Sequence, residues 1–256
     1  MESQNSQPSK WIFLSPHLDD VVLSCGGLIY DLSQKNVDIE IWTLCAGDPD
    51  PMLISEFAWQ LHQRWQTGAD AVNIRREEDS SSCQWINAHP VHLGFLDCIY
   101  RRSPTTGEAI IQKNDDLFTA LSKDEEYLVV EVQNLLESRL SDDAQIVIPL
   151  GLGTHKDHAL TRLAAERLSR STYYYADYPY AVLPEAQIEK SLPPHHQIFT
   201  FPISCSGLSA WQNAVGEHKS QISTFWGGLD EMKTKISQYW SAGGGSYLWY
   251  TTITPR

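Results

Sequence analysis

Two short segments of this chain carry side chains that could together bind a metal ion. The segment SPHLDD contains His17 and Asp20, and the segment THKDH contains His155 and His158. Within each pair the residues are three apart, which at a helix start places both side chains on one face. Two imidazoles and a carboxylate with an open coordination position form a catalytic zinc site. Zinc would lower the pKa of a bound water to about 7, and Asp19 could then accept the proton of that water.

The same residues also have a purely structural interpretation. Aspartate at a helix start is favoured by N-capping and by the helix dipole, so Asp19 and Asp20 could simply begin a helix. Thr154 with Asp157 resembles a capping box, and pairs of the HxxH type occur on many surface helices. Spacing alone therefore leaves metal binding and helix capping both open.

Each segment directly follows an apolar run that predicts a buried strand. These runs span residues 11–15 and 144–150, and each is followed by an expected helix, at 19–32 and 155–168. Strands alternating with helices imply parallel βαβ units and a doubly wound α/β sheet. Ligands of such sheets bind beyond the carboxyl ends of the strands, which is where both segments would lie.

The remaining pattern extends this alternation. Further strands are expected at 37–46, 92–95, 172–177 and 197–203, further helices at about 57–70, 75–87, 124–138 and 208–223, and an edge strand at 247–253. Residues 1–9 are expected to form a loose leader before a single domain over 10–256. The polar, turn-rich segments 101–123 and 179–196 are expected as loops over the site.

Composition narrows the class of protein. The net charge of −13 argues against a nucleic-acid-binding surface and would repel anionic membranes. The apolar runs are too short to span a bilayer, and the polar N-terminus has no signal core, so a cytoplasmic location is expected. Five scattered cysteines without a CxxC pair indicate reduced thiols. The oligomeric state is not indicated by the sequence.

Taken together, the motifs resemble the PIG-L/LmbE-like family of zinc-dependent N-acetylglucosaminyl deacetylases. The resemblance rests on PHLDD followed by VVLSCGG and on THKDH opening a helix. Two intermediate pieces, RREED at 75–79 and HLGFLD at 92–97, also fit, so that the similarity runs over at least residues 11–170. It implies a Rossmann-like, mostly parallel sheet with helices on both faces, in a single domain.

The resemblance also implies a role for each residue of the two segments. Carried over by position, His17, Asp20 and His158 become ligands of Zn²⁺, although such a site can accept other divalent metals. Asp19 becomes the general base that activates the zinc-bound water. His155 becomes the group that stabilises the oxyanion or protonates the leaving amine.

Three further residues fall where the family contacts substrate or supports the pocket. Asp157 would orient an imidazole, and Asp97 lies just past a short predicted strand. Arg75 has the same implied role, but it could equally form a structural ion pair with Glu78 or Asp79. The sequence leaves these two readings of Arg75 open.

The chain departs from the family pattern at two positions. Many members have glutamate where this chain has Val21, which bears on the support of the site more than on the metal. Some members have tyrosine where this chain has Gly153. Another tyrosine could take that place, and the sequence does not choose among Tyr100, Tyr178 and Tyr180.

The implied activity is hydrolysis of an N-acyl group, typically N-acetyl, from an amino sugar or sugar conjugate, which is a C–N bond other than a peptide bond. The partner would be a small N-acylated sugar or a related amide, and Trp59, Trp65 and Trp226 could stack on a sugar ring. Two alternatives remain: a zinc amidase acting on a non-sugar N-acyl substrate, and a catalytically silent member of the fold. A nucleotide-binding Rossmann protein is disfavoured because no GxGxxG follows the first strand.

Overall fold

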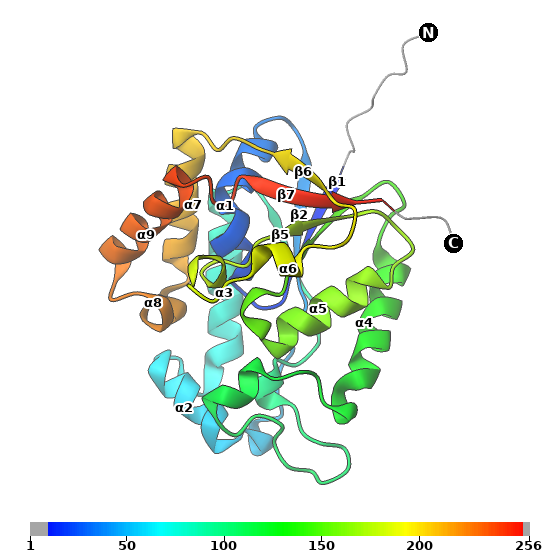
Figure 1. Cartoon of the computed structure of the whole chain (residues 1–256). Helices are drawn as coiled ribbons and strands as arrows, with labels where there is room; N and C mark the ends of the chain where they lie inside the picture. The colour runs from blue at the N-terminus through cyan, green and yellow to red at the C-terminus, as the bar shows by residue number, and fades with distance from the viewer. Residues whose placement is uncertain (1–9, 253–256) are drawn as a thin grey trace.

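The computed structural model describes residues 10–252, so the expected leader lies outside the described residues. Within them, a seven-stranded sheet crosses the molecule (Figure 1). Its strands in spatial order are β3 (His89–His92), β2 (Asp38–Thr43), β1 (Lys10–Ser15), β4 (Gln145–Pro149), β5 (Thr172–Tyr175), β7 (Tyr247–Thr251) and β6 (Gln197–Thr200). The strands from β3 to β5 are parallel, and β7 runs antiparallel to both β5 and β6. The expected mostly parallel, Rossmann-like sheet is thus confirmed.

Helices cover both faces of this sheet, as Figure 1 shows. One face is covered by α1 (Asp20–Ser33), α3 (Ala71–Trp85), α7 (Cys205–Glu217) and α9 (Leu229–Ser241). The other face is covered by α4 (Glu126–Arg139) and α5 (Lys156–Glu166). The shorter helices are α2 (Glu56–Arg64), α6 (Ile188–Ser191) and α8 (Lys219–Phe225).

The central strand β1 explains why two layers are needed. Phe13 is buried in the core beneath α1 and α7, whereas its neighbours Ile12 and Leu14 are buried in the core beneath α4 and α5. Successive side chains of a strand point to opposite faces, so a run that is apolar at every position must be covered on both sides.

The order of the strands creates the crevice in which the site lies. The chain runs outward from β1 through β2 to β3 and then crosses back to pair β4 with the opposite side of β1. The segments that leave the carboxyl ends of β1 and β4 therefore diverge over opposite faces of the sheet. Such a switch point is where open α/β sheets bind their ligands.

The close approach of α1 and α7 depends on a small residue. A Cβ added at Gly26 would lie 2.5 Å from Cδ1 of Trp211, the fully buried tryptophan of α7. The indole Nε1 of Trp211 in turn donates to the carbonyl oxygen of Val22, at 2.7 Å. Gly26 thus lets the two helices pack at short range.

Several expected boundaries were wrong at the C-terminal end. The last strand is not an edge, because β7 lies between β5 and β6. The expected helix 208–223 is broken at His218, whose ψ of 58° ends α7 before α8 begins. Helix α9 was not expected, although Leu229, Met232 and Ile236 follow helical spacing and the last two are buried.

Two smaller results complete the description. The short strand β3 lies three residues earlier than expected, because its pairing partners in β2 are residues 40–43. All five cysteines are free thiols, as predicted. No helix within residues 10–252 combines the length and the apolar character that a bilayer crossing requires.

Candidate active site

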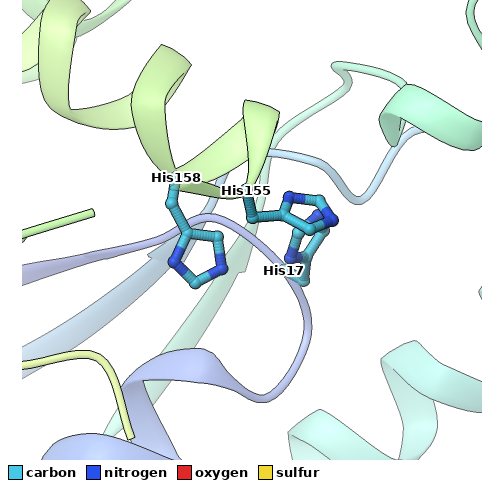
Figure 2. Close-up of side chains that lie close together, drawn as sticks. All are labelled: His17, His155 and His158. Atoms are coloured by element: carbon cyan, nitrogen blue, oxygen red, sulfur yellow. The ribbon is translucent and has the colours of Figure 1, made fainter. Parts of the chain in front are cut away.

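The carboxylate of Asp20 lies between two imidazoles at the crevice. His17 belongs to the loop after β1, Asp20 is the first residue of α1, and His158 lies in the first turn of α5. Asp20 Oδ2 is 3.0 Å from His17 Nδ1, and Asp20 Oδ1 is 3.3 Å from His158 Nε2. The two sequence segments therefore meet, and Figure 2 shows His155, at the N-cap of α5, and His158, in its first turn, near His17.

Each of these two imidazoles is held by a second carboxylate on its far side. His17 Nε2 is 3.0 Å from Asp157 Oδ2, and His158 Nδ1 is 2.6 Å from Asp177 Oδ1. This arrangement orients the rings so that His17 Nδ1 and His158 Nε2 both face Asp20. The sequence reasoning missed Asp177. No motif marks Asp177, which ends the expected strand 172–177.

Asp157 is itself fixed by a buried charge network. Its Oδ2 accepts from the backbone N–H of Cys98 at 2.9 Å, and its Oδ1 lies 2.5 Å from the Arg101 guanidinium. Arg101 also pairs with the buried Glu125 at 3.2 Å. Burial acts to raise the pKa of Asp157, but Arg101 and His17 outweigh burial and hold that pKa well below its usual range. Asp157 is therefore a fixed anion behind His17.

Asp19 is a buried carboxylate that does not cap its helix. It occupies the N-cap position of α1 but makes no side-chain capping hydrogen bond. Its nearest cation is Arg75, with Nη2 3.7 Å from Asp19 Oδ1. Burial and the neighbouring charge of Asp20 raise its pKa to about 6, against the opposing effect of Arg75. The capping interpretation of Asp19 is thus wrong.

His155 is a neutral imidazole at the N-cap of α5. Its Nδ1 accepts the backbone N–H of Asp157 at 3.3 Å, so no capping box forms between Thr154 and Asp157. Burial, together with the charges of His17 and His158, lowers the pKa of His155 to about 3. Because Nδ1 accepts, the proton of the neutral ring is assigned to Nε2.

Arg75 faces the site and not the acids of its own helix. Its guanidinium lies 3.7 Å from Asp19 and 3.8 Å from Asp97. Glu78 instead accepts hydrogen bonds from Ser220, and Asp79 lies 2.7 Å from His92. The interpretation of Arg75 as the partner of Glu78 or Asp79 in a structural ion pair is therefore wrong.

A cavity of about 300 Å³ is lined by seven of the site residues: His17, Asp19, Asp20, Arg75, Asp97, His155 and His158. Most of the remaining lining comes from α2 and its C-cap, the segment around residues 114–118, the start of the 3-10 helix Tyr180–Val182, and α8. The aromatic and polar side chains of this part are Trp65, Phe118, Tyr180, Phe225, Arg64, Asn114, Gln221 and Thr224. Among the three tryptophans considered for stacking, Trp65 reaches this cavity, whereas Trp59 and Trp226 line neighbouring ones.

The structure shows which of the three candidate tyrosines, Tyr100, Tyr178 and Tyr180, reaches the cavity. The hydroxyl of Tyr100 lies 2.6 Å from His62 Nε2. Tyr178 is buried and stacks on Tyr239, with ring centroids 4.4 Å apart. Tyr180 alone of the three lines the cavity.

Three groups within the described residues bring possible ligand atoms within 4.8 Å of one another. They are His17–His155–His158, His17–Cys45–Asp157 and Cys98–His155–Asp157. Burial and the charge of Asp157 raise the pKa of both thiols well above the usual range, which disfavours the thiolates that metals require. The donor set with His17 and His158 fits a divalent ion best, and the carboxylate of Asp20 touches both of its imidazoles.

One protein family matches the part of the chain that contains both motif segments. The profile of the PIG-L family, described as GlcNAc-PI de-N-acetylase, matches residues 12–169. This range includes most of β1, both motif segments and most of the residues discussed above.

Similar proteins cover nearly the whole chain. The 2'-N-acetylparomamine deacetylase of Niallia circulans is 25% identical over 253 residues, spanning 91% of this chain and 87% of the relative. The zinc-inhibited form of teicoplanin deacetylase Orf2 superposes with a TM-score of 0.77 at 27% identity, covering 94% of this chain and 97% of the other. A deacetylase–teicoplanin complex gives a TM-score of 0.78 at 25% identity, covering 96% and 100%.

Proposed function

Because the chain belongs to the PIG-L family, we propose that it is a metal-dependent hydrolase that removes an N-acyl group from an amino sugar or a sugar conjugate. Acetyl is the proposed acyl group, since the relatives described above are deacetylases. The observation that carries the proposal is the convergence of His17, Asp20 and His158 beside Asp19, a buried carboxylate without a capping bond.

We assign His17 Nδ1, the Asp20 carboxylate and His158 Nε2 as the metal ligands, with Zn²⁺ as the proposed ion. Asp157 and Asp177 support this choice because each bonds the far nitrogen of one ligand imidazole. A bound divalent ion would polarise the amide carbonyl and lower the pKa of the attacking water. One relative is described as zinc-inhibited, so the experiment below compares several ions.

Asp19 is proposed to accept the proton of the attacking water. Asp19 immediately precedes the proposed ligand Asp20 in the sequence, and it lines the cavity. A base works best when its pKa is near the operating pH, and burial places the pKa of Asp19 at about 6. Arg75 holds the carboxylate in place from 3.7 Å.

His155 is proposed to act as a hydrogen-bond donor. Its ring is neutral, with Nε2–H as the free donor, because the backbone of Asp157 occupies Nδ1. This donor can stabilise the amide oxygen as negative charge develops, or it can protonate the departing amine. Asp97, whose carboxylate lies 3.8 Å from the Arg75 guanidinium and 3.9 Å from His17 Nε2, holds both side chains at the cavity.

The cavity suits a small polar ring. Its volume of about 300 Å³ lies at the lower end of the roughly 300–1,000 Å³ typical of small-molecule sites. Trp65 offers an aromatic face, and Arg64, Asn114 and Gln221 offer hydrogen bonds to hydroxyl groups. A larger conjugate would therefore place its N-acyl sugar in the cavity and extend beyond it.

The proposal is tested by measuring acetate release from a substrate panel. The apoprotein is reloaded with Zn²⁺, Co²⁺, Ni²⁺ or Mn²⁺ and assayed on N-acetylglucosamine, N-acetylated aminoglycosides and N-acetyl amino acids. We expect hydrolysis of the sugar amides that depends on the metal and is lost in Asp19→Asn but kept in Asp230→Asn, an exposed control. Hydrolysis confined to N-acetyl amino acids would support the non-sugar amidase instead, and inactivity on every substrate would support a silent protein.

A further inference from the structure

Tyr180 reaches the cavity from a segment that sequence motifs do not mark. It lies beyond β5, at the start of a short 3-10 helix, Tyr180–Val182. Its ring contacts that of His158, with centroids 5.7 Å apart, and that of Phe118, at 6.4 Å. Phe118 also contacts His155, at 5.7 Å. The phenol is thus packed among the aromatic rings that surround the metal ligands.

Gly153 makes room for this ring. A Cβ added at Gly153 would overlap Cδ1 and Cγ of Tyr180. The φ of 79° at Gly153 is also a left-handed conformation that residues with a Cβ rarely adopt. The backbone before the second motif therefore forms the surface on which Tyr180 rests.

The hydroxyl of Tyr180 is a donor without a protein partner. Among residues 10–252 the structure gives it no hydrogen bond, whereas the hydroxyls of Tyr100, Tyr174 and Tyr175 each have a partner. A phenol has an ordinary pKa of about 10, so this hydroxyl is protonated at neutral pH. A protonated hydroxyl beside the cavity, with no other acceptor, is available to a ligand.

We propose that Tyr180 donates its O–H to the carbonyl oxygen of the scissile amide as the carbon becomes tetrahedral, and that Gly153 is required to seat it. This role rests on the proposed hydrolysis. A donor aimed at developing negative charge strengthens its bond in the transition state, and such a donor typically contributes about 10²–10³-fold to kcat.

Tyr180→Phe separates this role from aromatic packing, because only the hydroxyl is lost. We expect kcat to fall about 100-fold with little change in KM and in the melting temperature. The matched control is Tyr174→Phe, which removes a phenol bonded to Glu166 outside the cavity and should keep wild-type kcat.

A binding measurement gives a readout that does not depend on turnover. The probe is a methylphosphonamidate of glucosamine, whose tetrahedral phosphorus imitates the geometry of the reacting carbon. Calorimetric titration of the metal-loaded proteins should show about 100-fold weaker binding to Tyr180→Phe than to wild type. Unchanged probe affinity, or a rise in KM with kcat preserved, would overturn the donor role and leave Tyr180 as a packing surface.

The dependence on Gly153 is tested by a double-mutant cycle. Gly153→Ala should reduce kcat strongly in the wild type, because the new methyl group displaces the Tyr180 ring. In Tyr180→Phe the same change should cost little more, because the hydroxyl is already gone. Equal losses in both backgrounds would overturn the link between the two residues. An inactive wild type would overturn the proposed hydrolysis as well, whereas an active Tyr180→Phe overturns the Tyr180 proposal alone.

Discussion

Replacing Asp177 by asparagine should weaken metal binding without removing any proposed ligand. The carboxylate of Asp177 is buried and makes two hydrogen bonds: Oδ1 lies 2.6 Å from His158 Nδ1, and Oδ2 accepts from the Leu152 backbone N–H at 3.0 Å. Both bonds require acceptors on Asp177, but an asparagine amide has one acceptor and one donor group.

Either orientation of the new amide carries a cost. If the amide oxygen keeps the Leu152 bond, the amide N–H₂ donates to His158 Nδ1 and shifts the ring proton to Nε2, the atom that faces Asp20. If the oxygen keeps the His158 bond, the buried N–H of Leu152 loses its acceptor, at about 1–3 kcal/mol. Changes to such supporting carboxylates typically reduce metal affinity about 10–100-fold, which corresponds to about 1.4–2.7 kcal/mol.

The assay is competition for Zn²⁺ between the protein and a chromophoric chelator, with Asp177→Asn compared with wild type and with Asp230→Asn. The apoproteins are also melted, so that a loss of folding is recognised as a separate effect. A zinc affinity of Asp177→Asn within twofold of wild type, in a folded protein, would refute the reasoning that Asp177 sets the tautomer of His158.

Further predictions concern the base, the buried charges and the helix contact. Asp19→Asn should lower kcat by about 10²–10⁴-fold while the metal content measured by plasma emission stays stoichiometric; full activity would remove Asp19 from the mechanism. Arg101→Met leaves the buried Asp157 and Glu125 without this cation and should lower the free energy of unfolding in urea by about 3–5 kcal/mol. Gly26→Ala places a methyl group against Trp211 and should cost about 1–3 kcal/mol in the same assay; an unchanged midpoint would show that α7 moves freely.

The parts of the site that sequence reasoning anticipated are those governed by backbone rules. His17 and His158 follow apolar strands, and parallel neighbouring strands end at the same edge of a sheet, so their meeting could be expected. Because Asp19 stands at the start of an expected helix, the sequence also suggested that its side chain caps that helix. That reading failed because the carboxylate points away from the backbone N–H groups of α1 and toward Arg75.

The parts that could not be anticipated depend on tertiary packing. Asp177 and Tyr180 follow β5 without any motif, and only the pairing of β5 with β4 brings them to His158. Arg101 was taken as the start of a surface loop, yet it is buried because Asp157 and Glu125 lie on either side of its guanidinium. The inner position of β7 was missed because an apolar strand looks the same in sequence whether it has one neighbour or two.

The central claim, that His17, Asp20 and His158 hold a divalent ion, is tested most directly by anomalous diffraction from crystals of the zinc-loaded protein at the zinc edge. The account predicts one strong peak coordinated by His17 Nδ1, His158 Nε2 and the Asp20 carboxylate, with Asp19 near it but not bound. A peak coordinated by His155 in place of Asp20, or by Cys45 or Cys98 with Asp157, would contradict it.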